Sequence, residues 1–457
     1  MFLLLLGTIS SGFADPVASD VPAKDGKSPA RNQVNPNLLV DVSRNFVLNG
    51  ISQTINQVNP FCREVRNIPV RGTIRINARL EPVLVSDPNQ GDVDLVVNGT
   101  VTAQVLAYPG PLIVAGLADV PFQGHKRVLM QPGGFQEGPP ASLACGQIFL
   151  VDAETRFRGP LLNAAGKLVV RRVYRKRRAS AEEMLSRRVE QQINQQLEQR
   201  AAQVIANANQ SYREKFLDPL VQNGLSPTEL RYRTTPDHIY GEAGLARGKQ
   251  QGGVGKPPEL IDQPDLAVRL HESFVNNAAD NLFAGQTFTD VDMAQRVARF
   301  MGPLGRNIPT KREEVPWTVT FARENPVAIA FANHGFALTI KGTQFTQGEE
   351  IYPIPMNITA RYQIQKTTTG VKAVRQGEVE VRPPGFKPGS EKDMDVRQQI
   401  LAVQLEDRFS RMLSEQMVIE KLPLPERMTR EGPYLTTQAD AVQGWLVLAW
   451  KQEKMTR

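Results

Sequence analysis

The chain has 457 residues, which is too long for one ordinary hydrophobic core and predicts two or three domains. Hydrophobic residues make up 41% and charged residues 22%, the usual balance of a soluble globular protein. A net charge of +7 permits attraction to anionic lipid or nucleic acid but does not require it. These totals exclude a single small domain and leave the ligand open.

Residues 1–14 are predicted to be a secretory signal peptide, because a short apolar run is followed by small residues up to Ala14. The run is too short to span a bilayer, and a buried strand is the alternative. Residues 15–35 contain Pro16, Pro22 and Pro29 with almost nothing apolar, which predicts a disordered segment. The mature protein is therefore expected to be secreted or periplasmic.

Only two cysteines occur, Cys62 and Cys145. In an oxidising compartment they are expected to form one disulfide, and two free buried thiols are the alternative. Their spacing, with no histidine cluster nearby, does not indicate a metal site, and none is predicted.

A first α+β module is predicted over residues 36–246. Apolar residues spaced by three and four over 38–55 favour a short helix. Alternating patterns predict strands at 68–80, 92–105, 147–157 and 167–174. A capping box at Ser180 and Glu183 then predicts the start of a helix of about 40 residues, roughly 60 Å long. Pro219 is expected to kink or end it.

A second α+β module is predicted over residues 263–457, after a glycine-rich linker at 247–262. It repeats the order of the first: a short helix over 266–282, a set of strands, a long helix from Asp395, and a terminal strand. Its strands are predicted at 317–321, 327–331, 336–340, 356–362 and 377–381. Short strands joined by tight turns indicate antiparallel sheets.

The two predicted modules are related by an internal sequence repeat. Val40 to Asn49 returns as Val268 to Asn277, with Phe46 and Phe274 in the same place. Tyr232-Arg-Thr-Thr returns as Tyr434-Leu-Thr-Thr. A narrow apolar stripe on a long helix needs a sheet along its length, so each module is expected to wrap a curved antiparallel sheet on its helix.

This element order resembles the tubular lipid-binding superfamily, which includes the bactericidal/permeability-increasing and lipopolysaccharide-binding proteins. The resemblance covers Val40 to Trp450 and rests on element order, duplication and the apolar helices. It implies a hydrophobic tunnel or groove between helix and sheet that takes lipid acyl chains. It transfers no specific binding residue, because that superfamily is defined by shape.

Binding an acyl chain needs apolar surface and no cofactor, at about 0.8 kcal/mol per buried methylene. The candidate residues lie on the apolar faces of the two long helices, and plain core packing is the alternative for each. They are Met184, Leu197, Val204, Phe216, Leu405, Phe409 and Met412.

A dense basic run precedes the first long helix and comprises Arg171, Arg172, Arg175, Lys176, Arg177 and Arg178. It could be an anionic-surface patch for lipid head groups or acidic polymers, or a solvated strand end. Nucleic acid is not favoured, because the run lacks aromatic platforms beyond Tyr174.

The sequence contains no GxSxG, no phosphate-binding loop and no paired Cys/His set, and its four histidines are spread out. We therefore expect no enzymatic activity. The prediction is an exported, non-enzymatic protein that binds lipid or another elongated apolar ligand, with a membrane surface or an envelope protein as a further partner. A structural or protein-interaction component without a ligand is the alternative, and a hydrolase is a third hypothesis.

Overall fold

The computed structural model describes residues 35–65, 67–156, 160–218, 221, 227, 229–289, 291–293, 295–296, 317–386 and 394–453. The predicted signal peptide and residues 15–34 lie outside this part of the chain. Among the described helices, none is long and apolar enough to cross a membrane. The described residues form two compact units: Val47–Ala206 and Thr234–Asp237 belong to unit 2, and the rest belong to unit 1.

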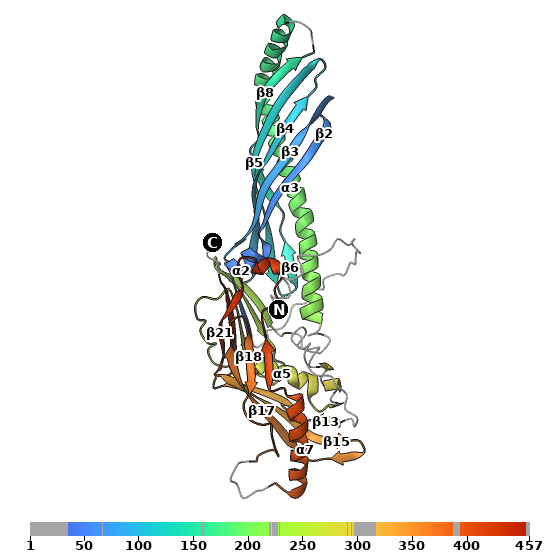
Figure 1. Ribbon diagram of the computed structural model, residues 1–457, viewed down its shortest axis with the longest axis vertical. Coiled ribbons are helices and arrows are strands. Elements are labelled where there is room, and N and C mark those ends of the chain that lie inside the picture. The colour runs from blue at the N-terminus through green and yellow to red at the C-terminus, as the bar shows by residue number, and fades with distance from the viewer. Residues whose placement is uncertain are drawn as a thin grey trace. The chain divides into compact units, whose positions relative to one another are not determined.

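Unit 2 contains an antiparallel seven-stranded sheet whose longest strand has β4 along one side and three short strands in series along the other (Figure 1). That central strand is β5. The strands are β2 (Gln53–Val65), β3 (Ile68–Leu84), β4 (Gly91–Ala107), β5 (Leu112–Gln131), β6 (Gly134–Glu137), β7 (Ala141–Ala144) and β8 (Gln147–Thr155). The strands predicted at 68–80, 92–105 and 147–157 are thereby confirmed.

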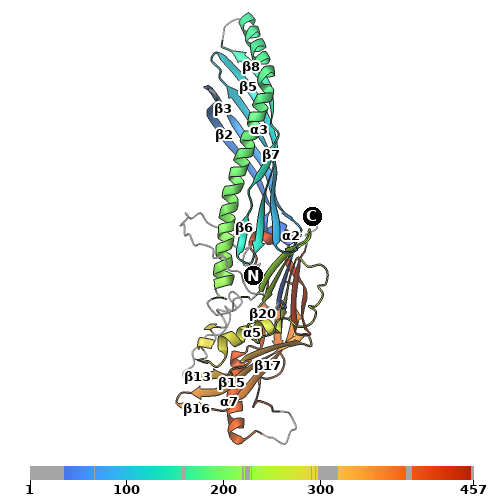
Figure 2. The same cartoon turned by 180° about the vertical axis from the view of Figure 1, so that it is seen from behind.

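The long helix α3 (Pro160–Tyr212) has 53 residues and continues as the π-helical turn η1 (Arg213–Leu217). Its part up to Ala206 belongs to unit 2 and runs along the sheet of that unit (Figure 2). The strand predicted at 167–174 is wrong, because this segment is helical. Its buried side chain is Val170 and Tyr174 is half-buried, four residues apart, whereas Leu168 and Val169 are exposed. Burial therefore follows the helical period. Ser180 lies inside the helix, so the predicted capping box does not start it.

Unit 1 contains a six-stranded antiparallel sheet in the order β21-β22-β11-β1-β10-β9, which mixes both halves of the sequence. Its strands are β1 (Leu38–Ser43), β9 (Glu229–Thr234), β10 (His238–Gly244), β11 (Leu266–His271), β21 (Tyr434–Val442) and β22 (Trp445–Gln452). The helices α2 (Arg44–Ile51) and α5 (Glu272–Phe283) begin directly after β1 and β11. The helices predicted over 38–55 and 266–282 are thus shorter, because each begins as a strand buried in the sheet.

The rest of unit 1 is a nine-stranded antiparallel sheet. It comprises β12 (Thr287–Thr289), β13 (Trp317–Phe321), β14 (Val327–Ala332), β15 (Gly335–Gln347), β16 (Glu350–Tyr352), β17 (Met356–Lys366), β18 (Val371–Arg375), β19 (Glu380–Arg382) and β20 (Gln416–Ile419). The predicted strands of the second half are present, with the last shifted to β19. The helix α7 (Val396–Met412) starts at a capping box formed by Asp395 and Gln398. The 3-10 turn η3 (Glu426–Thr429) precedes β21.

The compact units divide the chain at other places than the sequence repeat does, because β1, β9 and β10 pair into the sheet of unit 1. The segment predicted as a linker, 247–262, is held by hydrogen bonds within unit 1. The Gly253 backbone N–H donates to Asn35 O at 3.1 Å, and Trp445 Nε1 donates to Val254 O at 3.1 Å. The fold is therefore α+β with extensive antiparallel sheets and one long helix.

Candidate functional site

The inner face of the unit 2 sheet is apolar well beyond its closed core. The core packs Ala78, Val97, Val120, Phe122 and Ala144 of the sheet against Val189 and Ile193 of α3. Further along the same face, cross-strand neighbours continue the pattern: Ile74 pairs with Ala103, which pairs with Ala118. The next such row is Gly72, Val105 and Gly116. These residues are only half-buried, so the part of the chain that the structure describes covers this apolar face incompletely.

The outer face of the same strands is polar and exposed. On β3, Arg71, Thr73, Arg75, Asn77 and Arg79 are all exposed and alternate with the inner residues. This alternation is that of a sheet with one solvated face. The half-covered apolar row therefore belongs specifically to the side of the sheet that carries α3.

Along one side of α3, polar side chains join the helix to the main chain of β7 and β8. The Ile148 backbone N–H donates to Glu182 Oε1 at 2.9 Å, and the Gly146 N–H donates to Ser186 Oγ at 2.7 Å. The Ala144 N–H donates to Glu190 Oε1 at 2.9 Å. The spacing of four residues puts these three acceptors in one row on the helix, so this seam between helix and sheet is closed.

A buried charge fixes the helix further along. Lys126 of β5 is fully buried, and its Nζ lies 2.6 Å from Glu198 Oε2 of α3 and 3.1 Å from Glu137 Oε2. Burial by itself lowers the pKa of this lysine, but the hydrogen bonds to the two carboxylates outweigh it and raise the pKa. The ammonium therefore stays charged and holds α3 to β5.

The other side of α3 is open. Among the described strands, β2 pairs with β3 alone, and 11 of its 13 residues are exposed, so it forms an edge of the described sheet. A hollow of about 840 Å³ lies there, with Arg63 of β2 on its rim and a mostly polar face of α3 opposite. The α3 residues that line it are Ser180, Glu183, Met184, Arg187, Arg188, Gln191, Gln192 and Gln195. Helix and sheet thus form a trough with one sealed and one open seam.

The structure places the predicted ligand residues of α3 in different surroundings. Met184 lines the hollow, Leu197 packs on the closed core, and Val204 is half-buried further along the helix. The side chain of Phe216 lies outside the described residues. Of the three described side chains, Met184 is the one at the open seam.

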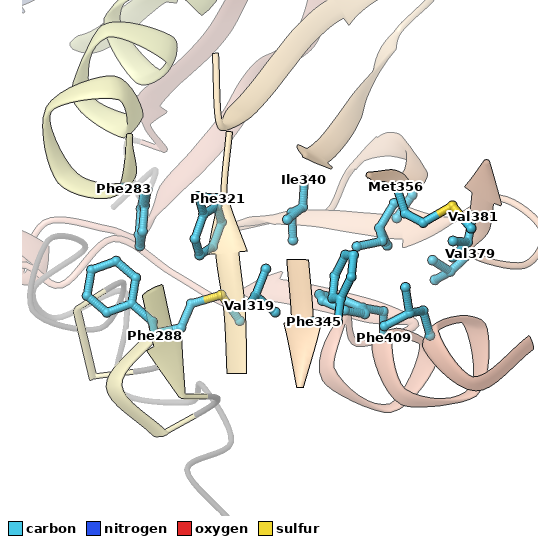
Figure 3. Close-up of a cluster of buried hydrophobic side chains, with 14 of the residues drawn as sticks. Phe283, Phe288, Val319, Phe321, Ile340, Phe345, Met356, Val379, Val381 and Phe409 are labelled. Atoms are coloured by element: carbon cyan, nitrogen blue, oxygen red, sulfur yellow. The ribbon is translucent and has the colours of Figure 1, made fainter. Parts of the chain in front are cut away.

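The predicted ligand residues of α7 belong to the hydrophobic core of unit 1, where Phe409 lies beside Phe345 (Figure 3). Leu405 is 0% and Phe409 2% exposed, and Met412 packs on the same cluster with Phe345 and Val381. Side chains buried this completely have their contacts satisfied by protein atoms. In unit 1 the helix therefore packs as core, which is the alternative weighed from the sequence.

The six residues of the basic run are all exposed and lie on the first half of α3, not on a strand end. Arg178 donates to Glu182 Oε1 at 2.8 Å and covers the ring of Phe149, with 5.8 Å from its Cζ to the centroid.

The structure does not bring the two cysteines together. Both thiols are free and exposed. Cys62 lies on β2, whereas the Cys145 N–H binds Pro121 O of β5, and β3 and β4 lie between those strands. Three strand spacings of about 4.8 Å exceed the Cα separation that a disulfide spans.

The apolar residues on the sheet side of the trough were not predicted from the sequence. The ligand was assigned to the helix faces, whereas the half-covered apolar surface is on β3, β4 and β5. The alternation at 68–80 already placed Ile74 and Ile76 on one face, and that signal could have identified them. The open seam had no signal in the sequence, because it depends on where α3 contacts the sheet.

Among the described residues, no group of three or more histidine, cysteine, aspartate or glutamate side chains is placed to hold a metal ion. The trough combines the apolar inner face of the sheet with arginine and glutamine side chains at the open seam. Side chains of these kinds can contact a ligand.

No family model matches the chain, and no curated protein matches it. In structure it is similar to a crystal structure of lipopolysaccharide binding protein, at 13% sequence identity and a TM-score of 0.31, over 93% of this chain and 100% of the other. That protein belongs to the superfamily that the element order resembles. Overlap at this level carries no argument for function, which has to be inferred from the geometry of unit 2.

Proposed function

We propose that the protein is an exported, non-enzymatic binding protein, and that unit 2 holds lipid or another elongated apolar ligand between α3 and its sheet. The observation that supports this is the row of half-buried apolar residues on the inner face, continuing past the closed core beside an open seam. An acyl chain laid on this face gains about 0.8 kcal/mol per buried methylene. No catalytic group is needed for such binding.

The open seam offers a route of entry that does not require unfolding. No described strand pairs with the outer side of β2, so an apolar chain can approach between Arg63 and the α3 residues of the hollow. The closed seam at Glu182, Ser186 and Glu190 keeps the helix in place on the opposite side.

The alternative function is a structural or protein-interaction component of a cell envelope or extracellular layer, with no ligand. The tight core around Leu405 and Phe409 favours this alternative for unit 1, because these side chains of α7 are already buried against other protein side chains. The two functions differ in one observable, the uptake of an apolar ligand by unit 2.

The experiment measures binding of a fluorescent fatty acid and, by native mass spectrometry, of lipid retained on the purified full chain. Ile74→Glu places a charge on the inner face, and Thr73→Glu places the same charge on the outer face one residue away. Val105→Glu and Leu106→Glu form a second matched pair on β4. We expect Ile74→Glu and Val105→Glu to lose binding at least about tenfold, because a carboxylate must be desolvated there.

Thr73→Glu and Leu106→Glu should bind as the unchanged protein does. Absence of binding by the folded unchanged protein, or equal loss in both members of a pair, would move the assignment to the structural alternative. Thermal unfolding of all four variants shows whether a loss reflects unfolding.

A further inference from the structure

The first half of α3 carries an outward-facing apolar stripe that the described residues leave uncovered. Leu168 is 66%, Val169 58% and Val173 49% exposed. The inward side of the same turns is taken by Val170, which is buried, and by Tyr174, whose hydroxyl donates to Ile148 O at 2.5 Å. The stripe is therefore the solvent side of a helix that is already docked on its sheet.

Basic residues share that solvent side. Arg172 and Lys176 follow Leu168 at intervals of four residues, which puts the three side chains in one row. Arg171 and Arg175 flank this row on one side, and Val169 and Val173 on the other. All four basic side chains are exposed.

The charge of this part of the helix has one sign. Between Pro160 and Ala181 there are seven lysines and arginines and no aspartate or glutamate. Lys167 contacts Asp152 and Arg178 contacts Glu182, so the charges of the first and the last of these seven residues are neutralised locally. The five between them, from Arg171 to Arg177, project from one stretch of helix without an acidic residue on it.

Apolar and basic residues on one exposed helical face match the chemistry of an anionic bilayer surface. Lysine and arginine are attracted to anionic head groups, and their apolar neighbours enter the boundary between head groups and acyl chains. A soluble acidic polymer would satisfy the charges but would leave Leu168 and Val169 in water. Charge complementarity and the apolar stripe together therefore favour a membrane over a polymer.

We propose that the outward face of α3 formed by Leu168, Val169, Arg172, Val173 and Lys176 docks the protein on a bilayer that contains anionic lipid. The five residues span 168–176, about 12 Å along the helix axis at 1.5 Å per residue. This surface does not include the hollow beside β2, so the docking proposal can be tested independently of the proposed ligand site.

The test is co-sedimentation of the full chain with vesicles of phosphatidylcholine alone and of phosphatidylcholine mixed with phosphatidylglycerol. We expect binding to the mixed vesicles only, and weaker binding as salt shortens the Debye length from about 10 Å at 0.1 M to about 3 Å at 1 M. Arg172→Glu with Lys176→Glu should weaken binding by at least about 25-fold, at roughly fivefold per basic residue removed.

Leu168→Ser with Val169→Ser tests the apolar part, and should weaken binding to mixed vesicles while leaving capture by a soluble polyanion such as heparin unchanged. Arg75→Glu with Arg200→Glu is the control, because both arginines are exposed elsewhere on unit 2 and the change in net charge is the same. It should bind vesicles as the unchanged protein does.

Equal loss in the control pair would show a general charge effect and overturn the proposal. Equal binding of the Leu168→Ser, Val169→Ser variant would also overturn it, since the apolar stripe would then have no role. Uptake of fluorescent fatty acid by the Arg172→Glu, Lys176→Glu variant shows whether the proposed ligand site is still intact.

Discussion

Asp41 and Arg269 occupy equivalent positions of the sequence repeat and form an ion pair with each other, Oδ2 to Nη2 2.7 Å. The relationship follows from the register of β1 on β11. Val40 pairs with its own repeat mate Val268, and Asp41 pairs with Ala267 as Leu39 pairs with Arg269. The two strands are thus related by a local two-fold axis that passes between the valines.

The other strands of the six-stranded sheet are arranged in pairs about the same two-fold axis. β10 lies beside β1 as β22 lies beside β11, and β9 and β21 form the two outer edges. A strict duplicate would place two identical residues at positions 41 and 269, and identical charges there would repel each other. Opposite charges turn that position into an attractive contact, which a duplicated chain can acquire and a symmetric dimer cannot.

Arg269→Met should destabilise unit 1, because it leaves Asp41 buried without its partner. Burial already raises the pKa of Asp41 despite the nearby Arg269. We expect a loss of about 3 kcal/mol in the free energy of unfolding, measured by denaturant titration. Asp41→Asn combined with Arg269→Met should recover part of it, since no buried charge remains. Equal stability of the single and double variants would contradict this account.

Lys126 should make a pH-dependent contribution at the alkaline end. Its pKa in the folded state lies above the ordinary 10.5, because the hydrogen bonds to Glu198 and Glu137 outweigh burial. A raised pKa gives a contribution that is complete below about pH 10.5 and is lost as the pH rises through the folded value.

The measurement for Lys126 compares the unfolding free energy of the unchanged protein with that of Lys126→Met as the pH rises. The difference should shift against the unchanged protein above about pH 10.5. Lys256→Met is the control, since Lys256 is exposed and its ion pair is with the exposed Glu259. A difference for Lys126→Met that stays constant with pH would show that the ion pairs do not stabilise the fold.

Gly124 lies at a close approach of β5 to α3. A Cβ there would lie 2.9 Å from Ile193 Cγ2 and 3.0 Å from Leu197 Cδ1. Gly124→Val should therefore push the helix from the sheet and cost about 1–3 kcal/mol in unfolding free energy. Gly133→Val is the control, because a Cβ at Gly133 meets nothing within 4 Å. Similar melting temperatures of both variants would show that the helix contact is loose.

The sequence was informative where a pattern has one structural meaning. Alternation at 68–80 and 92–105 predicted β3 and β4, and the repeat predicted equivalent elements in the two halves. It misled where an apolar run fits two periods. Leu38 to Val42 is a strand buried between β10 and β11, and such runs cannot be distinguished from a helix by spacing alone.

The candidate site was less predictable for a physical reason. Leu405 and Leu197 show the same apolar spacing on their helices, yet one is fully buried and the other half-buried. Whether a helix face becomes core or a binding surface depends on the strands opposite it. That information lies in long-range pairing, such as Ala103 beside Ile74, and no local pattern contains it.

His271 should make unit 1 sensitive to mild acid. It is the N-cap of α5: its Nδ1 accepts a hydrogen bond from the Ser273 N–H at 3.1 Å, and its ring packs edge-on against Trp445. Burial lowers the pKa of His271, although nearby Glu272 acts in the opposite direction. A protonated ring could no longer accept at Nδ1, so the cap would be lost together with the neutral state.

A histidine with a lowered folded pKa stabilises the fold fully above its unfolded value near 6.5, and the contribution is lost as the pH falls through the folded value. Hydrogen exchange in α5 should therefore accelerate on going from pH 7 to pH 5, after correction for intrinsic exchange. His271→Asn keeps a side-chain acceptor that does not titrate in this range, so its exchange should change less. An unchanged pH response in His271→Asn would assign the sensitivity to another group in unit 1.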